Sequence, residues 1–272
     1  MQDAPDAGTK QPGLWTRDFS LITLVNFCLF VGFSSIDMLV PLHARTLGAS
    51  DQQVGWIAAI FTLAALITRP LTGGGMDRWG RRAILLLALA AIALSTFGYI
   101  STTGLGLLFA LRIMHGLSWG GANTAVLTVA SDQIPRASFG EGQGYFHLST
   151  SLASMLSPIL AFGVFDALGF SVLAALAGSI TLAALLLALP IRSRPVTADG
   201  SGTEAVSAAS VSAGGTEATS RKRVAFLERS ALVPSILILI INILQGAISG
   251  FIALFASNRG IPNAGLYFVV FS

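Results

Sequence analysis

Long apolar runs recur along this chain and limit what it can fold into. They cover residues 20–43, 53–72, 83–102, 105–130, 143–165, 169–190 and 231–256. An eighth run opens near Ala264 and reaches Ser272. An α-helix needs about 20 mostly apolar residues to cross the hydrocarbon core of a bilayer. The pattern therefore predicts an all-α membrane protein with seven spans and part of an eighth.

The composition excludes other classes of protein. Of 272 residues, only 11% are charged, whereas soluble domains carry about a quarter. The single cysteine, Cys28, excludes an internal disulfide and a cysteine-cluster metal site. The basic residues are scattered over the loops, which disfavours nucleic-acid binding. We find no metal-binding or nucleophile motif and no clustered acid and base, so we expect no enzyme, metal or cofactor.

The segment between the sixth and seventh apolar runs differs from its surroundings. Residues 193–220 are mostly Ser, Ala, Gly and Thr without apolar periodicity, which is typical of a flexible linker. We therefore divide the chain into a tail (1–17), a six-span bundle (18–192), a linker (193–230) and the start of a second bundle (231–272). Because a chain end inside a span would leave backbone groups unpaired in lipid, we expect the sequence to be truncated.

The basic residues predict the orientation of the spans. If the spans alternate, thirteen Lys and Arg residues fall on the side of the N-terminus, two (Arg45 and Arg259) fall on the opposite side, and Arg112 lies within the fourth span. Cytoplasmic loops carry the excess of Lys and Arg. We therefore predict a multi-pass protein of the plasma membrane, in a bacterium the inner membrane, with a cytoplasmic N-terminus and no cleaved signal peptide.

The junction of the second and third spans carries the most specific motif. It reads Gly73-Gly74-Gly75-Met76-Asp77-Arg78-Trp79-Gly80-Arg81-Arg82. The residues fit Gly-x-x-x-Asp-Arg-x-Gly-Arg-Arg, and through them the chain resembles the major facilitator superfamily. We expect the glycines to permit a tight turn and close helix approach. We also expect Asp77 to act as a conformational switch with Gly73, Arg78, Gly80, Arg81 and Arg82, latching the cytoplasmic ends of two bundles, while Asp132 competes for the arginines.

The resemblance implies a fold and a mechanism. The fold is the major facilitator fold, of which this sequence would hold the N-terminal six-helix bundle and the start of the second. Substrate would lie between the bundles near mid-membrane, and rocking of the bundles would expose it to each side in turn. The implied partners are a small-molecule substrate, protons and the lipid bilayer, with the protein a monomer.

The fourth and fifth spans bear on the direction of transport. Arg112 opens a segment, through Ala122, that resembles the family's fourth-span motif, in which the arginine is linked to proton coupling. Gly144, Ala153, Ser157-Pro158 and Ala161 resemble, loosely, the fifth-span motif of its antiporters. This favours proton-coupled export of a small drug-like or metabolite substrate. The alternatives are proton-coupled uptake of a sugar or other nutrient, or a transport-inactive membrane fragment.

Asp37 is the candidate proton carrier. It is the only acid deep within the first span, about 8–13 Å below the outer surface. Arg112 lies at a similar depth on the fourth span, on the order of 12 Å from its outer end. Burial favours the neutral form of the carboxyl, whereas a nearby guanidinium favours the charged form. The entry of substrate between the two residues can therefore change which form of Asp37 is favoured. The competing interpretations are a static ion pair, an exposed acid near the headgroups and, for Arg112, snorkelling to the surface.

Polar and aromatic residues of several spans are candidates for the substrate path. A polar stripe on one face of the fifth span includes His147, which is also a second candidate proton carrier. Amides in the seventh span need partners in the membrane, either helices or substrate. The candidates are Asn26, Phe33, Trp119, Asn123, His147, Ser154, Asn242 and Gln245.

Overall fold

The computed structural model describes residues 13–191 and, beyond them, residues 236–237, 240–241, 255 and 259. Residues 13–191 form helices and turns and contain no strand, which confirms the predicted all-α class in this part of the chain. The predicted linker and the start of the second bundle lie largely outside the described residues, so the proposed division into domains stays a prediction.

The described helices follow the predicted spans in order. They are α1 (Arg17–Asp37), α2 (Val40–Thr46), α3 (Asp51–Trp79), α4 (Arg81–Gly98), η1 (Tyr99–Ser101), α5 (Leu105–Gln133), η2 (Arg136–Ser138), α6 (Phe139–Leu168) and α7 (Phe170–Ala188). Two N-termini are capped as their sequences favour. The hydroxyl of Thr16 accepts a hydrogen bond from the Phe19 amide, and Ser50 forms a capping box with Gln53.

Five segments of the described chain are long and apolar enough to cross a membrane. They are Arg17–Thr46, Asp51–Trp79, Arg81–Ser101, Arg136–Leu168 and Phe170–Ala188. The helix α5, 29 residues long, is not among them. It carries Arg112, His115 and several glycines, and it packs against both α3 and α4. A helix shielded by its neighbours can carry polar groups that a lipid-facing helix cannot, because those groups find partners in the protein.

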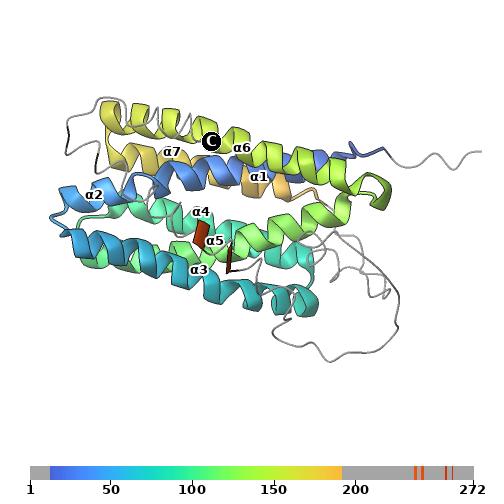
Figure 1. Cartoon of the computed structure of the whole chain (residues 1–272), viewed down its shortest axis with the longest axis horizontal. Helices are drawn as coiled ribbons and strands as arrows, with labels where there is room; N and C mark the ends of the chain where they lie inside the picture. Colours follow the sequence, from blue (N-terminus) through green and yellow to red (C-terminus); the bar gives the residue numbers. More distant parts are fainter. Residues whose placement is uncertain (1–12, 192–235, 238–239, 242–254, 256–258, 260–272) are drawn as a thin grey trace, which may run out of the picture.

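The helix contacts repeat internally. Helices α1, α6 and α7 lie together on one side of the bundle, and α3, α4 and α5 lie together on the other (Figure 1). Exchanging α1 with α5, α3 with α6 and α4 with α7 converts the main contacts into one another: α3–α5 becomes α6–α1, and α1–α7 becomes α5–α4. Such internal repeats are common in membrane transporters. The repeat makes α1 and α5 equivalent, so that Asp37 and Arg112 lie on corresponding helices.

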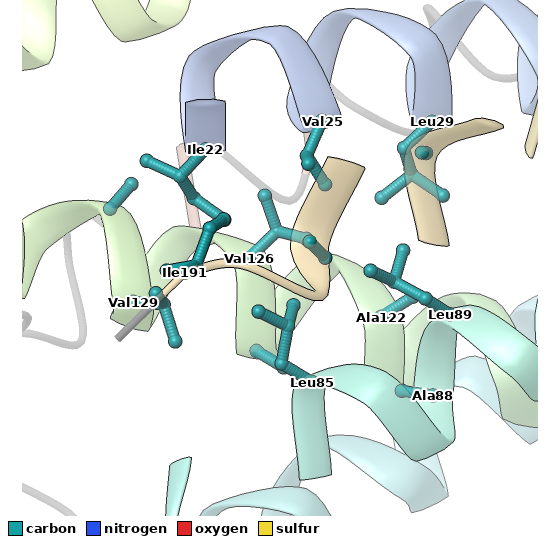
Figure 2. Close-up of a cluster of buried hydrophobic side chains, with 14 of the residues drawn as sticks. Ile22, Val25, Leu29, Leu85, Ala88, Leu89, Ala122, Val126, Val129 and Ile191 are labelled. Atoms are coloured by element: carbon teal, nitrogen blue, oxygen red, sulfur yellow. The ribbon is translucent and has the colours of Figure 1, made fainter. Parts of the chain in front are cut away.

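Two apolar clusters fill the bundle. One gathers Ile22 and Leu29 of α1, Leu89 of α4 and Val126 of α5, together with Ile191 (Figure 2). The other lies around α2 and the helix ends near it, and it includes Ile36, Ile57, Tyr99 and Phe170. Large apolar side chains such as Leu66 and Leu71 of α3 remain exposed, as expected of surfaces that face lipid.

The structure corrects the prediction for the first span. The apolar run predicted one helix over residues 20–43. Instead α1 ends at Asp37, and Pro41 belongs to α2. Proline has no amide hydrogen, so it cannot donate to the carbonyl four residues earlier. That carbonyl belongs to Asp37, which explains why the helix breaks there.

The glycines of the junction motif permit both a tight turn and close helix packing, as we expected. Residues 73–79 continue α3. The turn is made by Gly80, whose φ of 86° favours glycine. Gly75 serves close packing, since a Cβ there would lie 3.1 Å from Cδ1 of Ile84. The apolar run ends at residue 72, where contact with lipid is expected to end. The helical hydrogen bonds of α3 continue about two turns beyond that residue, to Trp79.

Candidate functional site

The two charged residues that the sequence placed deep in the membrane meet in the structure. Nη2 of Arg112 donates a hydrogen bond to Oδ1 of Asp37 across 2.9 Å, joining α5 to α1. Only 4% of the Arg112 side chain is exposed, against 38% of the Asp37 side chain. The guanidinium is therefore sealed inside the bundle while the carboxylate remains accessible. Snorkelling of Arg112 to the surface, one of the alternatives, does not occur.

The third helix holds the guanidinium from the other side. Nε of Arg112 donates to the backbone oxygen of Ile57 at 3.3 Å. The guanidinium carbon lies 4.3 Å from the centre of the Phe61 ring, close enough for a cation–π interaction. Arg112 therefore contacts α1 through Asp37 and α3 through Ile57 and Phe61. Because Arg112 of α5 contacts both α1 and α3, a movement of any of these three helices against the others would change its contacts.

An aromatic cluster lies beside the ion pair. We define it as Phe30, Phe33, Phe61 and Trp119. Phe33 stacks on Trp119 with ring centres 3.5 Å apart, and Phe30 meets Trp119 edge-on at 5.0 Å. The ring centres of Phe33 and Phe61 lie 5.7 Å apart. Trp119 is buried, but Phe30 and Phe33 are only half-buried. The cluster brings two predicted substrate-path residues, Phe33 and Trp119, next to the ion pair.

Sequence reasoning missed His115 and Tyr99. His115 lies one turn after Arg112 on α5 and is completely buried. Its Nδ1 lies 3.3 Å from the Tyr99 hydroxyl, and its ring packs against Phe33 and Phe61. The spacing of three residues from Arg112 places both side chains on one helix face. That spacing was a signal that could have drawn attention to His115.

The other predicted path residues take different positions. Asn26 is buried, and its Nδ2 donates to the hydroxyls of Ser149 at 2.9 Å and Thr150 at 2.8 Å, so it links α1 to α6. Asn123 and Ser154 are half-buried, and His147 is exposed. Asn242 and Gln245 lie outside the described residues.

The junction motif forms contacts at the opposite end of α5. Arg81 makes a salt bridge with Asp132, the acid that we expected to compete with Asp77 for the arginines of the motif. Arg82 donates to the backbone oxygen of Leu189, just after α7, at 2.6 Å. Asp77 and Arg78 are exposed and form no salt bridge with any described residue.

Two glycines bring α5 against α3. A Cβ on Gly116 would lie 2.4 Å from the backbone oxygen of Phe61, and one on Gly120 would lie 2.3 Å from that of Ala65. These distances are too short for any Cβ, so the close approach requires glycine. Small residues four apart are a common device for packing membrane helices. They place the backbone of α3 beside Arg112.

Other chemistry is not apparent in the described part of the chain, where no three His, Cys, Asp or Glu residues gather to hold a metal ion. The site is therefore the ion pair between Arg112 and the accessible carboxylate of Asp37, flanked by the aromatic cluster.

Two known proteins with similar sequences are named for export and for multidrug resistance. The chain is 24% identical over 263 residues to the staphylopine export protein of Staphylococcus aureus, a match that covers 95% of this chain and 63% of that protein. It is 27% identical over 150 residues to multidrug resistance protein 2 of Bacillus subtilis, covering 53% of this chain and 38% of that protein. The chain thus spans less than two thirds of the length of either relative.

A solved structure shows the same fold. The match to the crystal structure of a D-xylose–proton symporter covers 93% of this chain and 65% of the symporter chain, with a TM-score of 0.64 and 15% identity. At that identity the likeness concerns the fold alone. The sequence family described as Major Facilitator Superfamily matches residues 22–272, nearly the whole chain. The apolar helices, their internal repeat and this match together show that the chain is a multi-pass membrane protein belonging to the Major Facilitator Superfamily.

Proposed function

We propose that this chain takes part in proton-coupled export of a small drug-like or metabolite molecule, with Asp37 as the proton carrier and Arg112 as its partner. One observation carries the proposal: the 2.9 Å ion pair between α1 and α5 joins an accessible carboxylate to a sealed guanidinium. A proton can reach Asp37, whereas Arg112 keeps its charge and its place.

The exchange follows from the charges. In the ionised state Asp37 neutralises Arg112. When Asp37 takes up a proton it loses its negative charge, and the attraction between α1 and α5 weakens. Releasing the proton restores the attraction. A substrate that binds only one of these states is therefore coupled to the proton, because a ligand shifts an equilibrium by its differential affinity for the two states.

The direction of transport rests on the relatives. The names of the two similar proteins above speak of export and of multidrug resistance. A third relative, 24% identical over 132 residues, is the quinolone resistance protein NorA of Staphylococcus aureus. All three names fit a protein that removes small molecules from the cell, and none of the observations favours sugar uptake. The cytoplasmic N-terminus and the switching role of Asp77 remain part of the proposal.

Asp37→Asn tests the proposal. Asparagine keeps the size and one hydrogen-bond acceptor, but it cannot carry a proton. In proteoliposomes with an imposed pH gradient and a quinolone as probe, we expect binding to persist and gradient-driven accumulation to fall to the level of empty liposomes. Asp18→Asn is the matched control, since Asp18 lies at the other end of the same helix. If Asp37→Asn still accumulates the probe at the wild-type rate, the proton passes elsewhere, and His147 is the next candidate.

A further inference from the structure

Tyr99 reaches the ion pair between Asp37 and Arg112 from an element that the proposed function does not yet use. It opens η1, directly after α4, and its side chain is completely buried. Its hydroxyl lies within interaction range of the Arg112 guanidinium and 3.3 Å from Nδ1 of His115. A buried phenol usually has its hydroxyl hydrogen-bonded, and here both neighbours belong to α5. Tyr99 therefore connects the end of α4 to the part of α5 that carries the charge.

The packing around Tyr99 holds it against α5. Gly98 precedes Tyr99 in the chain, and a Cβ on Gly98 would lie 2.5 Å from Cδ2 of Leu111. Leu111 in turn precedes Arg112, so the end of α4 lies directly against α5 beside the guanidinium. The Tyr99 ring also lies edge-on to Phe170 of α7, with ring centres 6.2 Å apart. The hydroxyl therefore has a fixed place relative to Arg112.

Hydrogen bonds that run in one direction satisfy the three side chains. Arginine only donates, so the Tyr99 hydroxyl accepts from Arg112. The hydroxyl hydrogen is then available to Nδ1 of His115, which accepts it in the neutral imidazole. Hydrogen bonds from a charged donor are stronger than neutral ones, and hydrogen bonds in a chain strengthen one another. The Tyr99 hydroxyl is therefore a good acceptor for a guanidinium.

The acceptors around the guanidinium come from both sides of the bundle. Asp37 belongs to α1, which lies with α6 and α7, whereas the Ile57 oxygen belongs to α3 and Tyr99 follows α4 (Figure 1). When Asp37 takes up a proton, Arg112 loses attraction to the first side and keeps its contacts with the second. A guanidinium that is 4% exposed cannot replace a lost partner with bulk water. It therefore needs an acceptor on its own side of the bundle.

We propose that Tyr99 is a positioning residue for Arg112, and that its hydroxyl becomes the main side-chain acceptor of the guanidinium while Asp37 is protonated. The inference rests on the proposed function, because it takes Asp37 as the proton carrier. In the ionised state the carboxylate is the stronger acceptor, and Tyr99 contributes little. In the protonated state the hydroxyl stabilises the buried charge. Tyr99 therefore favours proton uptake by Asp37, and it keeps Arg112 in place until the carboxylate binds again.

The surroundings allow the hydroxyl to be tested by itself. In the described part of the chain, the titratable side chains that face the guanidinium come from three elements: Asp37 of α1, Tyr99 of η1 and His115 of α5. The helix α3 presents a backbone oxygen and an aromatic ring instead. His43 of α2 stacks on Phe170, which in turn lies edge-on to Tyr99. Tyr99→Phe therefore removes one hydroxyl and leaves every charge around Arg112 in place.

Infrared spectroscopy of the protein in lipid vesicles tests the inference. The carbonyl stretching band of protonated Asp37, identified by its loss in Asp37→Asn, reports the pH at which half of this carboxyl is protonated. Without the hydroxyl the protonated state loses stabilisation. We therefore expect Tyr99→Phe to lower this pH by about one unit, which is a tenfold lower proton affinity. Tyr145→Phe is the matched control and should not change it, since Tyr145 lies on α6 and packs against Trp15.

The same titration separates this inference from the proposed function. An equal half-protonation pH in Tyr99→Phe and the wild type would overturn the inference and leave the proposed function standing. A wild type without an Asp37 band, down to the lowest pH at which the protein stays folded, would overturn the proposed function and the inference with it. Tyr99→Leu separates the hydroxyl from the ring, and we expect it to shift the pH as Tyr99→Phe does. A shift in Tyr99→Leu alone would mean that Tyr99 acts by packing, and would overturn the positioning role.

A second measurement leaves Tyr99 unchanged. The sequence has three tyrosines, Tyr99, Tyr145 and Tyr267. In a variant with Tyr145→Phe and Tyr267→Phe, labelled with ring-¹³C-tyrosine, the phenol C–O band belongs to Tyr99 alone. We expect this band to shift over the pH range in which the Asp37 band appears, because the hydroxyl then accepts a stronger hydrogen bond from Arg112. A phenol band that stays constant while Asp37 titrates would overturn the inference.

Discussion

Two ion pairs are attached to opposite parts of α5, and they differ in depth. The inner pair joins Arg112 of α5 to Asp37 of α1, and its guanidinium is 4% exposed. The junction pair joins Asp132 of α5 to Arg81 of α4, and its side chains are 24% and 18% exposed. Both pairs link α5 to a neighbouring helix. They therefore act on the same helix in surroundings of different polarity.

The difference separates two uses of the same chemistry. A guanidinium sealed in the bundle cannot be rehydrated when its partner is lost, so the inner pair makes the structure depend on the charge of Asp37. A partly exposed arginine near a helix end can turn to water, so the junction pair holds two helices together without such dependence. We therefore expect protonation of Asp37 to weaken the packing of α1 against α5, and protonation of Asp132 to have little effect on the helices. The following predictions test this contrast.

The largest effect on stability should come from removing Asp37 alone. Asp37→Leu leaves the Arg112 charge buried without a partner, and we expect a loss of about 2–4 kcal/mol, somewhat below the usual range because Asp37 is partly exposed. The double variant with Arg112→Leu should recover most of this loss, since no charge remains buried. Thermal unfolding of the wild type, both single variants and the double variant in detergent gives the coupling energy. Additive losses in the double variant would show that the two residues are not coupled.

Gly116→Ala should disturb the inner pair through packing. The new methyl would overlap the backbone oxygen of Phe61, whose ring lies under the guanidinium. We expect a loss of about 1–3 kcal/mol from overpacking, measured by the same unfolding assay. Gly163→Ala is the matched control, since a Cβ on Gly163 of α6 meets nothing within 4 Å. Equal stability of the two variants would mean that α3 and α5 can separate without cost.

Much of this fold could be predicted from the apolar runs, because a membrane span has a fixed minimum length. The apolar runs could not predict at which residue the helical hydrogen bonds end. The end of α1 at Asp37 depends on Pro41, which is visible in the sequence but lies inside an apolar run. The extension of α3 to Trp79 depends on helical residues beyond the lipid-facing stretch. In both cases local backbone chemistry, rather than hydropathy, set the boundary.

The site was predictable to a lesser degree. Asp37 and Arg112 were visible because a charge within an apolar run is costly and invites an explanation. The places of Phe61 and Tyr99 were not visible, because they depend on how α3 and η1 pack around α5. Asn26 was expected to line a path, yet its amide nitrogen is used to join α1 to α6. A polar residue in a span indicates a partner but does not say which helix supplies it.

The smallest effect should come from the junction pair. Arg81→Ala and Asp132→Ala should each cost about 1 kcal/mol or less, because the partner left behind can reach water. The exposed Arg78, on the same motif, offers a matched control, and Arg78→Ala should change stability by no more than about 0.5 kcal/mol. Added salt sharpens the contrast, since partly exposed charges are screened and buried ones are not. The coupling energy between Arg81 and Asp132 should therefore fall as salt rises, while that between Asp37 and Arg112 stays constant. The opposite result would be a larger coupling energy for Arg81 and Asp132 than for Asp37 and Arg112, with no dependence on salt. It would mean that the packing of α5 depends on the junction pair rather than on the inner pair.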